Sequence, residues 1–177
     1  KSSQTISIME QLISFNMKKA YFDLVEEKLT TEPLDYAWVV QLYDEIKFKL
    51  IGILKPDSEL RNDIDERMDS ELFEQMIRYK AFDYRDLQQL VNYVFDKILR
   101  LCAPVRDPDV KAMLDELNEM MDKAETIPKV LTKYIEYANE GLDIIYDDLG
   151  VVLNGLQNEN PNLWSDGMDR QSDGGSF

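Results

Sequence analysis

The sequence predicts an all-α protein, an antiparallel bundle of six to eight helices with a flexible C-terminal tail. Apolar residues recur at intervals of three and four along most of the chain, which is the period of one helix face. No stretch alternates between apolar and polar residues for long enough to form a strand. We therefore expect one helical domain over residues 1–156, followed by a polar, disordered tail over residues 157–177.

The first two helices are expected over residues 4–30 and 36–54. Pro33 closes the first helix, and Asp35 can cap the second. The second helix is apolar over an unusually wide arc, and a helix of that kind is normally buried among several neighbours. We therefore expect it to lie in the middle of the bundle, together with the helix that ends at Cys102. Its apolar residues are Tyr36, Val39, Val40, Leu42, Tyr43, Ile46, Phe48, Leu50, Ile51 and Ile53.

Two shorter, strongly charged helices are expected next, over residues 59–67 and 70–80. Pro56 separates them from the second helix, and Ser58 can cap the first of the pair. Asp83 begins a longer helix that leads to Cys102, a cysteine on the apolar stripe and therefore expected to be a buried small hydrophobe.

A short, stiff corner follows that helix. Pro104 lacks an N–H group and pushes Ala103 out of helical geometry, so the helix should stop near Cys102. Asp107 is expected to be the N-cap of the next helix, with Pro108 at the first helical position. This next helix carries an apolar stripe from Val110 to Ala124.

The last helix is expected to start at Thr126 and to run past Leu149, weakened progressively by Gly141, Gly150 and Gly155. From Gln157 the composition shifts to Asn, Gly, Ser, Asp and Gln, which is typical of a disordered tail. Leu163 and Trp164 interrupt this polarity and can dock on the helical body or on another protein.

Composition excludes several classes of function. The 20 basic and 35 acidic residues give a formal charge of −15, which argues against nucleic acid or an anionic membrane as a partner. A basic protein remains compatible with this charge, although acidity often serves solubility alone. The absence of histidine and the single cysteine exclude histidine-based catalysis, an internal disulfide and the usual zinc sites. No apolar segment could span a bilayer and no signal peptide is recognised, so we expect a cytoplasmic protein. Because histidine is absent and only one cysteine is present, we also expect neither a metal nor a cofactor.

Acidic clusters do not match known sites. The stretch from Asp57 to Asp69 fails the calcium-loop pattern, because the position that requires glycine holds Met68 when Asp63 is taken as the first ligand. Asp143, Asp147 and Asp148 are interpreted as surface charge, because no base or nucleophile accompanies them.

Two features could contact a partner protein. Arg106, beside Asp107 on the corner, can act either as an intramolecular clamp that fixes the two helices or as a hook that faces a partner; the clamp is favoured. Tyr79, Phe82 and Tyr84 surround an expected turn, where they form either an exposed binding cluster or a plug between helix ends.

The corner hexapeptide Cys-Ala-Pro-Val-Arg-Asp at 102–107 resembles the T-complex protein 11 family. The likeness extends over about residues 15–120, and the members of that family are considerably longer, so this chain resembles their N-terminal part. The resemblance also rests on Ala20-Tyr-Phe-Asp-Leu, Pro33-Leu-Asp-Tyr, Leu42-Tyr-Asp-Glu-Ile, Leu60-Arg-Asn-Asp-Ile and Ala81-Phe-Asp.

The resemblance implies a helical scaffold or adaptor that is not an enzyme. It favours a structural component of a ciliary or flagellar (axonemal) assembly, located in the cytoplasm or the cilium. The alternative that it leaves open is a regulator of cyclic-AMP-dependent protein kinase signalling that acts by binding proteins. Both alternatives need protein partners and no cofactor.

Overall fold

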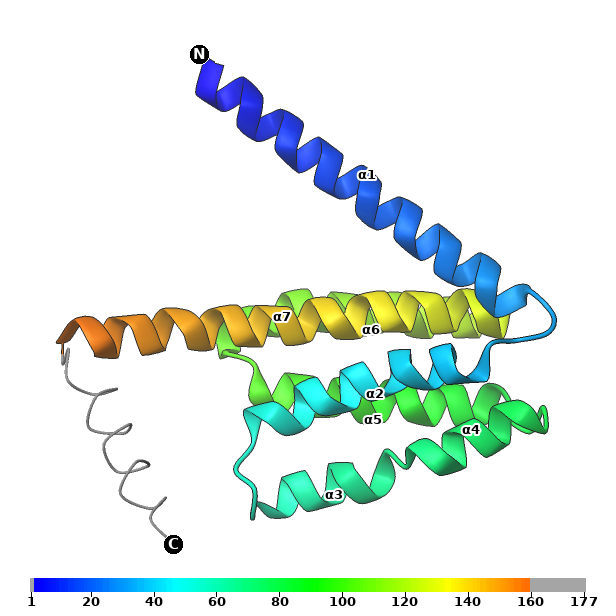
Figure 1. The fold of residues 1–177 in the computed structure, drawn as a ribbon. Helices are drawn as coiled ribbons and strands as arrows, with labels where there is room; N and C mark the ends of the chain where they lie inside the picture. Colours follow the sequence, from blue (N-terminus) through cyan, green and yellow to red (C-terminus); the bar gives the residue numbers. More distant parts are fainter. Residues whose placement is uncertain (1, 160–177) are drawn as a thin grey trace, which may run out of the picture.

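The computed structural model describes the backbone of residues 2–159 and the side chains of residues 3–150, and this part of the chain is all-α. The chain reverses direction between most consecutive helices, while α3 and α4 follow one another in the same direction; this arrangement confirms the predicted helical bundle (Figure 1). The α-helices are α1 (Ser2–Thr30), α2 (Tyr36–Ile53), α3 (Glu59–Arg67), α4 (Ser70–Arg78), α5 (Tyr84–Leu101), α6 (Asp107–Asp122) and α7 (Ile127–Glu159), with a 3₁₀ turn, η1 (Pro104–Arg106), before α6.

Short polar side chains start four of the helices. Asp35 accepts a hydrogen bond from the backbone N–H of Trp38, and Ser58 accepts one from that of Arg61. Asp83 and Asp86 form a reciprocal capping box at the start of α5. Asp69, which the sequence reading did not single out, caps α4. These caps satisfy N–H groups that have no partner within the helix, and they therefore fix where each helix begins.

The centre of the bundle differs from the expectation, because α7 is the helix that packs against the largest number of others. It contacts α1, α2, α5 and α6, whereas α2 lies between α7 and the α3–α4 pair. The wide apolar arc of α2 is consequently not all buried, and Phe48 is 62% exposed. The buried residues of α7 are Val130, Leu131, Thr132, Tyr134, Ile135, Ala138, Gly141, Leu142 and Ile145.

Gly141 has a packing role that the sequence reading did not foresee. A Cβ atom at this position would lie 3.2 Å from Cγ2 of Ile98, which is tighter than ordinary contact, so the missing side chain lets α5 approach α7. The three expected weak points do not stop the helix within the described residues. Because α7 continues to Glu159, it includes the first three residues of the expected tail, while residues 160–177 lie outside the described part.

The corner between α5 and α6 contains a correction. α5 ends at Leu101 with Cys102 buried, as expected, but the 3₁₀ turn Pro104–Arg106 leads directly into α6. Arg106 therefore occupies the N-cap position, and Asp107 is the first residue of the helix rather than its cap. The carboxylate of Asp107 instead accepts a hydrogen bond from Sγ of Cys102 at 3.3 Å.

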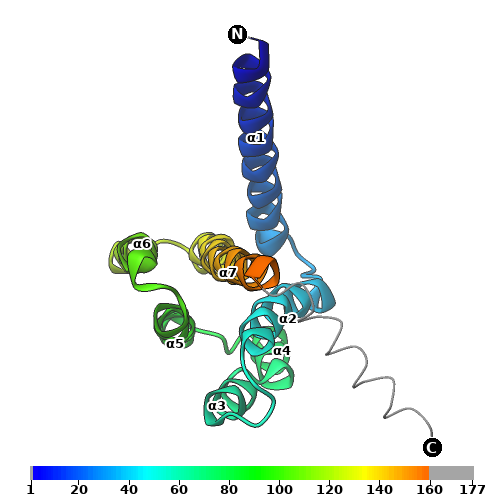
Figure 2. The same ribbon diagram turned by 90° about the vertical axis from the view of Figure 1, so that its left-hand side faces the viewer.

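The helix α1 leaves the body of the bundle. Its C-terminal part packs on α7, where Val25 is buried, while its N-terminal part projects away from the other helices in both views (Figures 1 and 2). Most of the large apolar side chains of this helix are therefore open to solvent.

Candidate protein-binding groove

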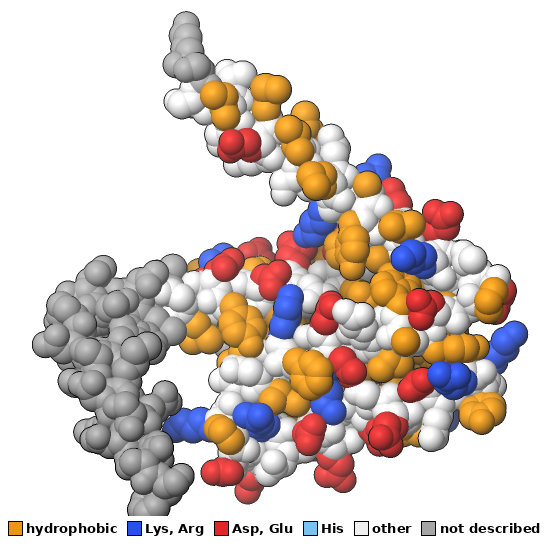
Figure 3. All heavy atoms as spheres, viewed as in Figure 1, with side chains coloured by type: hydrophobic (Ala, Val, Ile, Leu, Met, Phe, Trp, Pro, Cys, Tyr) orange, Lys and Arg blue, Asp and Glu red, His pale blue; other side chains and the backbone are white. Residues whose placement is uncertain are grey.

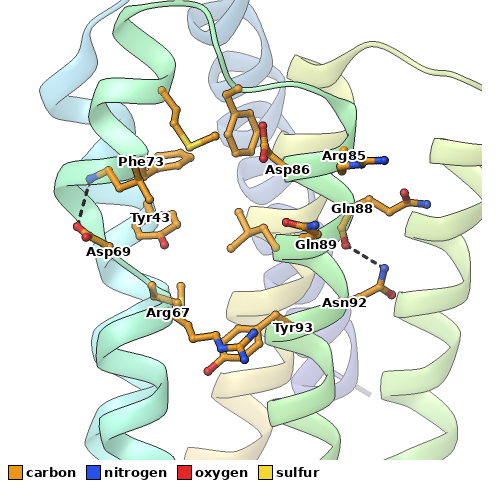
Figure 4. A pocket seen from close by; sticks show the side chains of 15 residues that line it. Tyr43, Arg67, Asp69, Phe73, Arg85, Asp86, Gln88, Gln89, Asn92 and Tyr93 are labelled. Atoms are coloured by element: carbon orange, nitrogen blue, oxygen red, sulfur yellow. Dashed lines mark hydrogen bonds between the residues drawn. The ribbon is translucent and has the colours of Figure 1, made fainter.

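A groove of about 810 Å³ lies between α4 and α5, with the end of α3 at one edge (Figure 4). It forms because α4 packs on α2 while α5 packs on α6 and α7, so that α4 and α5 diverge after the connection at residues 79–83. Its lining residues are Tyr43, Arg67, Met68, Asp69, Leu72, Phe73, Met76, Phe82, Arg85, Asp86, Gln88, Gln89, Leu90, Asn92 and Tyr93.

Three aromatic rings from separate segments form part of the groove lining. The rings of Tyr43 from α2 and Phe73 from α4 are stacked, with centroids 4.2 Å apart. Phe82 meets Phe73 edge-on at 5.4 Å. Burial, followed by the charge of Asp44, raises the pKa of Tyr43, so its hydroxyl stays neutral at physiological pH. This part of the lining is therefore an apolar, preformed surface.

The α4 side of the groove presents apolar side chains to solvent. Leu72 is 53% exposed, and Met76 follows it one turn later on the same helix. The half-buried Leu90 lines the opposite wall from α5. Apolar side chains that stay accessible in a concave surface are typical of sites that bind another molecule.

Charged and amide side chains make the rim. Arg67 and Asp69 stand on one side, and the α5 side carries Arg85 and Asp86 together with Gln88, Gln89 and Asn92 (Figure 4). The two Asp residues also serve as capping groups of α4 and α5, which holds their carboxylates in place. Because both signs of charge are present on both sides, the rim suits a partner segment of mixed charge.

A polar network fixes the end of α3 at the lower edge of the groove. Tyr93 of α5 donates a hydrogen bond to Asp63 of α3 at 2.6 Å, and this bond lowers the pKa of the Asp63 carboxyl group. Burial and the same contact raise the pKa of Tyr93. Arg67 lies over the Tyr93 ring, 5.7 Å from its centroid. On the α2 side, the buried Lys47 pairs with Asp65 at 3.2 Å.

The predicted aromatic cluster divides among three environments. Tyr79 is 81% exposed at the end of α4. Phe82 lines the groove and is half-buried. Tyr84 is also half-buried, and its hydroxyl donates to the carbonyl of Glu125 in the turn between α6 and α7. The structure thus brings only Phe82 of the three into the groove.

The predicted corner residues lie away from the groove. The guanidinium of Arg106 donates two hydrogen bonds to Asp148 of α7, from Nε at 3.1 Å and from Nη2 at 2.9 Å. This is the intramolecular contact that the clamp interpretation requires, although its partner lies on α7 rather than on α5 or α6. Asp148 is therefore an ion-pair partner and not merely surface charge; Asp143 likewise pairs with Lys49 at 3.1 Å.

Several residues that line the groove were not predicted from the sequence to belong to a site. The sequence did not single out Leu72 or Leu90, and Arg67 fell in a helix that was described only as strongly charged. The sequence signal that could have revealed them is the polar run Arg85-Asp86, Gln88-Gln89 and Asn92 beside an apolar helix face. Trp164, the remaining predicted interaction residue, lies outside the described residues.

The described part of the chain offers no metal site and no membrane span. Among these residues, no group of three or more potential metal ligands of the types His, Cys, Asp and Glu is arranged so that it could hold a metal ion. Its helices likewise include none that is long and apolar enough to cross a membrane.

Comparisons with known proteins identify the family. A family model described as T-complex protein 11 matches residues 9–137, which is well over half of the chain. The human T-complex protein 11-like X-linked protein 1 is 32% identical over 98 residues, which make up 55% of this chain and 19% of that protein. The rat T-complex protein 11 homolog is 35% identical over 100 residues, 55% of this chain and 17% of the homolog.

The mouse T-complex protein 11 is 30% identical over 114 residues, 63% of this chain and 19% of the mouse protein. The chain thus spans about a fifth of the length of these relatives. No solved structure matches it. The match of the family model over most of the bundle, at the residues where the sequence resemblance was recognised, shows that this chain belongs to the T-complex protein 11 family.

Proposed function

We propose that this chain is a non-enzymatic helical adaptor that binds an amphipathic segment of a partner protein in the groove between α4 and α5. The observation that carries the proposal is the pairing of an aromatic lining with the accessible side chain of Leu72, inside a rim that carries both signs of charge. Apolar side chains of the segment would enter beside Leu72 and Leu90, and its charged flanks would meet Arg85 and Asp69. The absence of histidine from the chain supports a role without catalysis.

The setting that we propose is a ciliary or flagellar assembly, in which the adaptor is a structural component. Membership of the T-complex protein 11 family supports this setting. The alternative is regulation of cyclic-AMP-dependent protein kinase signalling through protein binding, for which the same groove would serve. The net charge of −15 supports a partner with a basic surface in either setting.

Extraction of ciliated cells that express the tagged chain tests the proposal. We expect the chain to stay with the axonemes after salt extraction, and the Leu72→Asp variant to be lost to the supernatant because its carboxylate would be desolvated in the groove. Leu149→Asp, at an exposed position of α7, is the matched control and should stay bound. A stoichiometric cytosolic complex with kinase subunits would favour the alternative. Equal retention of both variants would contradict binding through the groove.

A further inference from the structure

Six large side chains form a continuous apolar row on α1, which we call the α1 stripe. Their spacing of three or four residues puts them on one side of the helix. Each is between 47% and 69% exposed, far more than is usual for a row of this length on a folded domain. Figure 3 shows hydrophobic side chains, in orange, along the projecting part of α1. The stripe consists of Ile6, Met9, Ile13, Met17, Tyr21 and Leu24.

The α1 stripe does not face the body of the molecule. The residues of α1 that pack against the core are Phe22, Val25 and Leu29. Since successive residues are about 100° apart around a helix, the stripe lies roughly 130° from this buried side. Lys18 pairs with Glu140 of α7 at 3.6 Å, so attachment to α7 extends to about this position. A second helix can therefore lie along the stripe without displacing α7.

We propose that the α1 stripe binds a second copy of this chain, with the two α1 helices antiparallel. In one register every stripe residue meets a stripe residue of the other copy: Ile6 meets Leu24, Met9 meets Tyr21, and Ile13 meets Met17. The pattern is self-complementary, as a two-fold symmetric interface requires. A shift of one helical turn in either direction places Leu24 opposite Ser2 or Glu10, which removes apolar pairs.

Charge favours a second copy in this orientation. The whole chain carries −15, but residues 2–22 contain only Glu10, Lys18 and Lys19 as charged residues, so two such helices do not repel each other. Antiparallel pairing leaves the acidic bodies at opposite ends of the contact, which spans about 27 Å from Ile6 to Leu24. That separation exceeds the Debye length of about 8 Å at physiological ionic strength. Parallel pairing would instead bring the two bodies together.

Sedimentation of the 177-residue chain over a range of concentrations tests the proposal. We expect a dimer, and we expect Ile13→Glu to be a monomer with unchanged helicity and unchanged melting of the body. Phe15→Glu is the matched control, because Phe15 is 64% exposed on the other side of the same helix, and this variant should remain a dimer. A parent chain that stays monomeric overturns the proposal and leaves the stripe for a different protein. Loss of the dimer in Phe15→Glu but not in Ile13→Glu also overturns it.

Cysteine cross-linking tests the orientation, in a Cys102→Ala background. A mixture of the Ile6→Cys and Leu24→Cys chains should form a disulfide-linked heterodimer under mild oxidation. The Ile6→Cys chain alone should not cross-link, because its two thiols would be about 27 Å apart. Efficient cross-linking of the Ile6→Cys chain with itself would show parallel helices and would overturn the antiparallel arrangement.

Discussion

Arg106 ties the corner between α5 and α6 to α7 through two hydrogen bonds to the Asp148 carboxylate. A planar guanidinium reaches both oxygens at once, whereas a lysine ammonium cannot reproduce this fork. We therefore expect Arg106→Ala to lower the melting temperature by a few degrees and Arg106→Lys to lower it less. The effect should stay well below that of a buried pair, because the two side chains are 40% and 30% exposed. Scanning calorimetry that finds both variants equal to the parent would contradict the clamp.

The same pair makes a pH prediction. The hydrogen bonds from Arg106 hold the pKa of Asp148 below its ordinary value. A carboxyl group with a lowered pKa in the folded state contributes stability at neutral pH and loses it as the pH falls through the folded-state pKa. The difference in melting temperature between the parent and Arg106→Ala should thus hold from pH 7 to about 5 and shrink below about pH 4. A constant difference down to pH 2 would show that Arg106 stabilises the fold in another way.

The helix α5 has a core side and a groove side, and one substitution distinguishes them. Val94 is fully buried, so Val94→Asp should destabilise the fold by roughly 3–5 kcal/mol, because a carboxylate without a partner enters the core. Leu90, one turn earlier on α5, is only partly buried: it packs against the edge of the core and also lines the groove. Leu90→Asp should therefore cost much less, about 1–2 kcal/mol. Urea unfolding measures both values, and equal losses would contradict the placement of Leu90.

Two helices end without the glycine that usually marks such an end. The backbone angle φ is positive at both ends: it is 53° at Lys80, after α4, and 54° at Ala124, after α6. At α6, Glu125 N–H donates to the carbonyl of Met120 and Ala124 N–H donates to that of Met121, the hydrogen-bond pair of a Schellman turn. Because a Cβ atom is disfavoured at positive φ, Ala124→Gly should stabilise the fold by about 1 kcal/mol.

A matched substitution inside α6 tests the argument about Ala124. Ala112→Gly, at an exposed position in the middle of the same helix, should destabilise the fold by about 1 kcal/mol, because glycine loses more backbone freedom there. The two variants should therefore move the midpoint of urea unfolding in opposite directions. A loss of stability in both would mean that the turn at Ala124 does not strain the alanine backbone.

The sequence could predict what depends on near neighbours. Asp35, Ser58 and Asp83 were recognised as helix starts because a cap acts within three residues.

The central position of α7 could not be predicted from the sequence, since the approach of Ile98 to Gly141 depends on which helices lie side by side. The groove could not be predicted for the same reason, because Tyr43, Phe73 and Leu90 are far apart in the chain and meet only in the folded protein. The sequence favoured a clamp role for Arg106, but it could not identify Asp148, 42 residues away, as the hydrogen-bond partner.

The part of the chain that the structure describes consists of a helical body with a groove and a projecting helix with an apolar stripe. If both proposals hold, a dimer joined through α1 would present two α4–α5 grooves, one on each body. Two grooves at a fixed separation would bind a repetitive assembly more tightly than one, because the second contact forms at a high effective concentration. This arrangement suits a structural adaptor better than a regulator that binds a single soluble partner.

The net charge of −15 sets the response of the whole molecule to salt. Repulsion among the excess carboxylates destabilises the compact state, whereas exposed ion pairs such as Lys123–Glu119 contribute little. Salt screens both the repulsion and the ion pairs, so the larger of the two effects decides whether added salt raises or lowers the melting temperature. Because the repulsion is the larger effect, we expect the melting temperature to rise between about 10 and 200 mM NaCl. KCl at the same ionic strength should act alike, because screening does not depend on the identity of the cation. A melting temperature that falls over this range would mean that the ion pairs outweigh the repulsion.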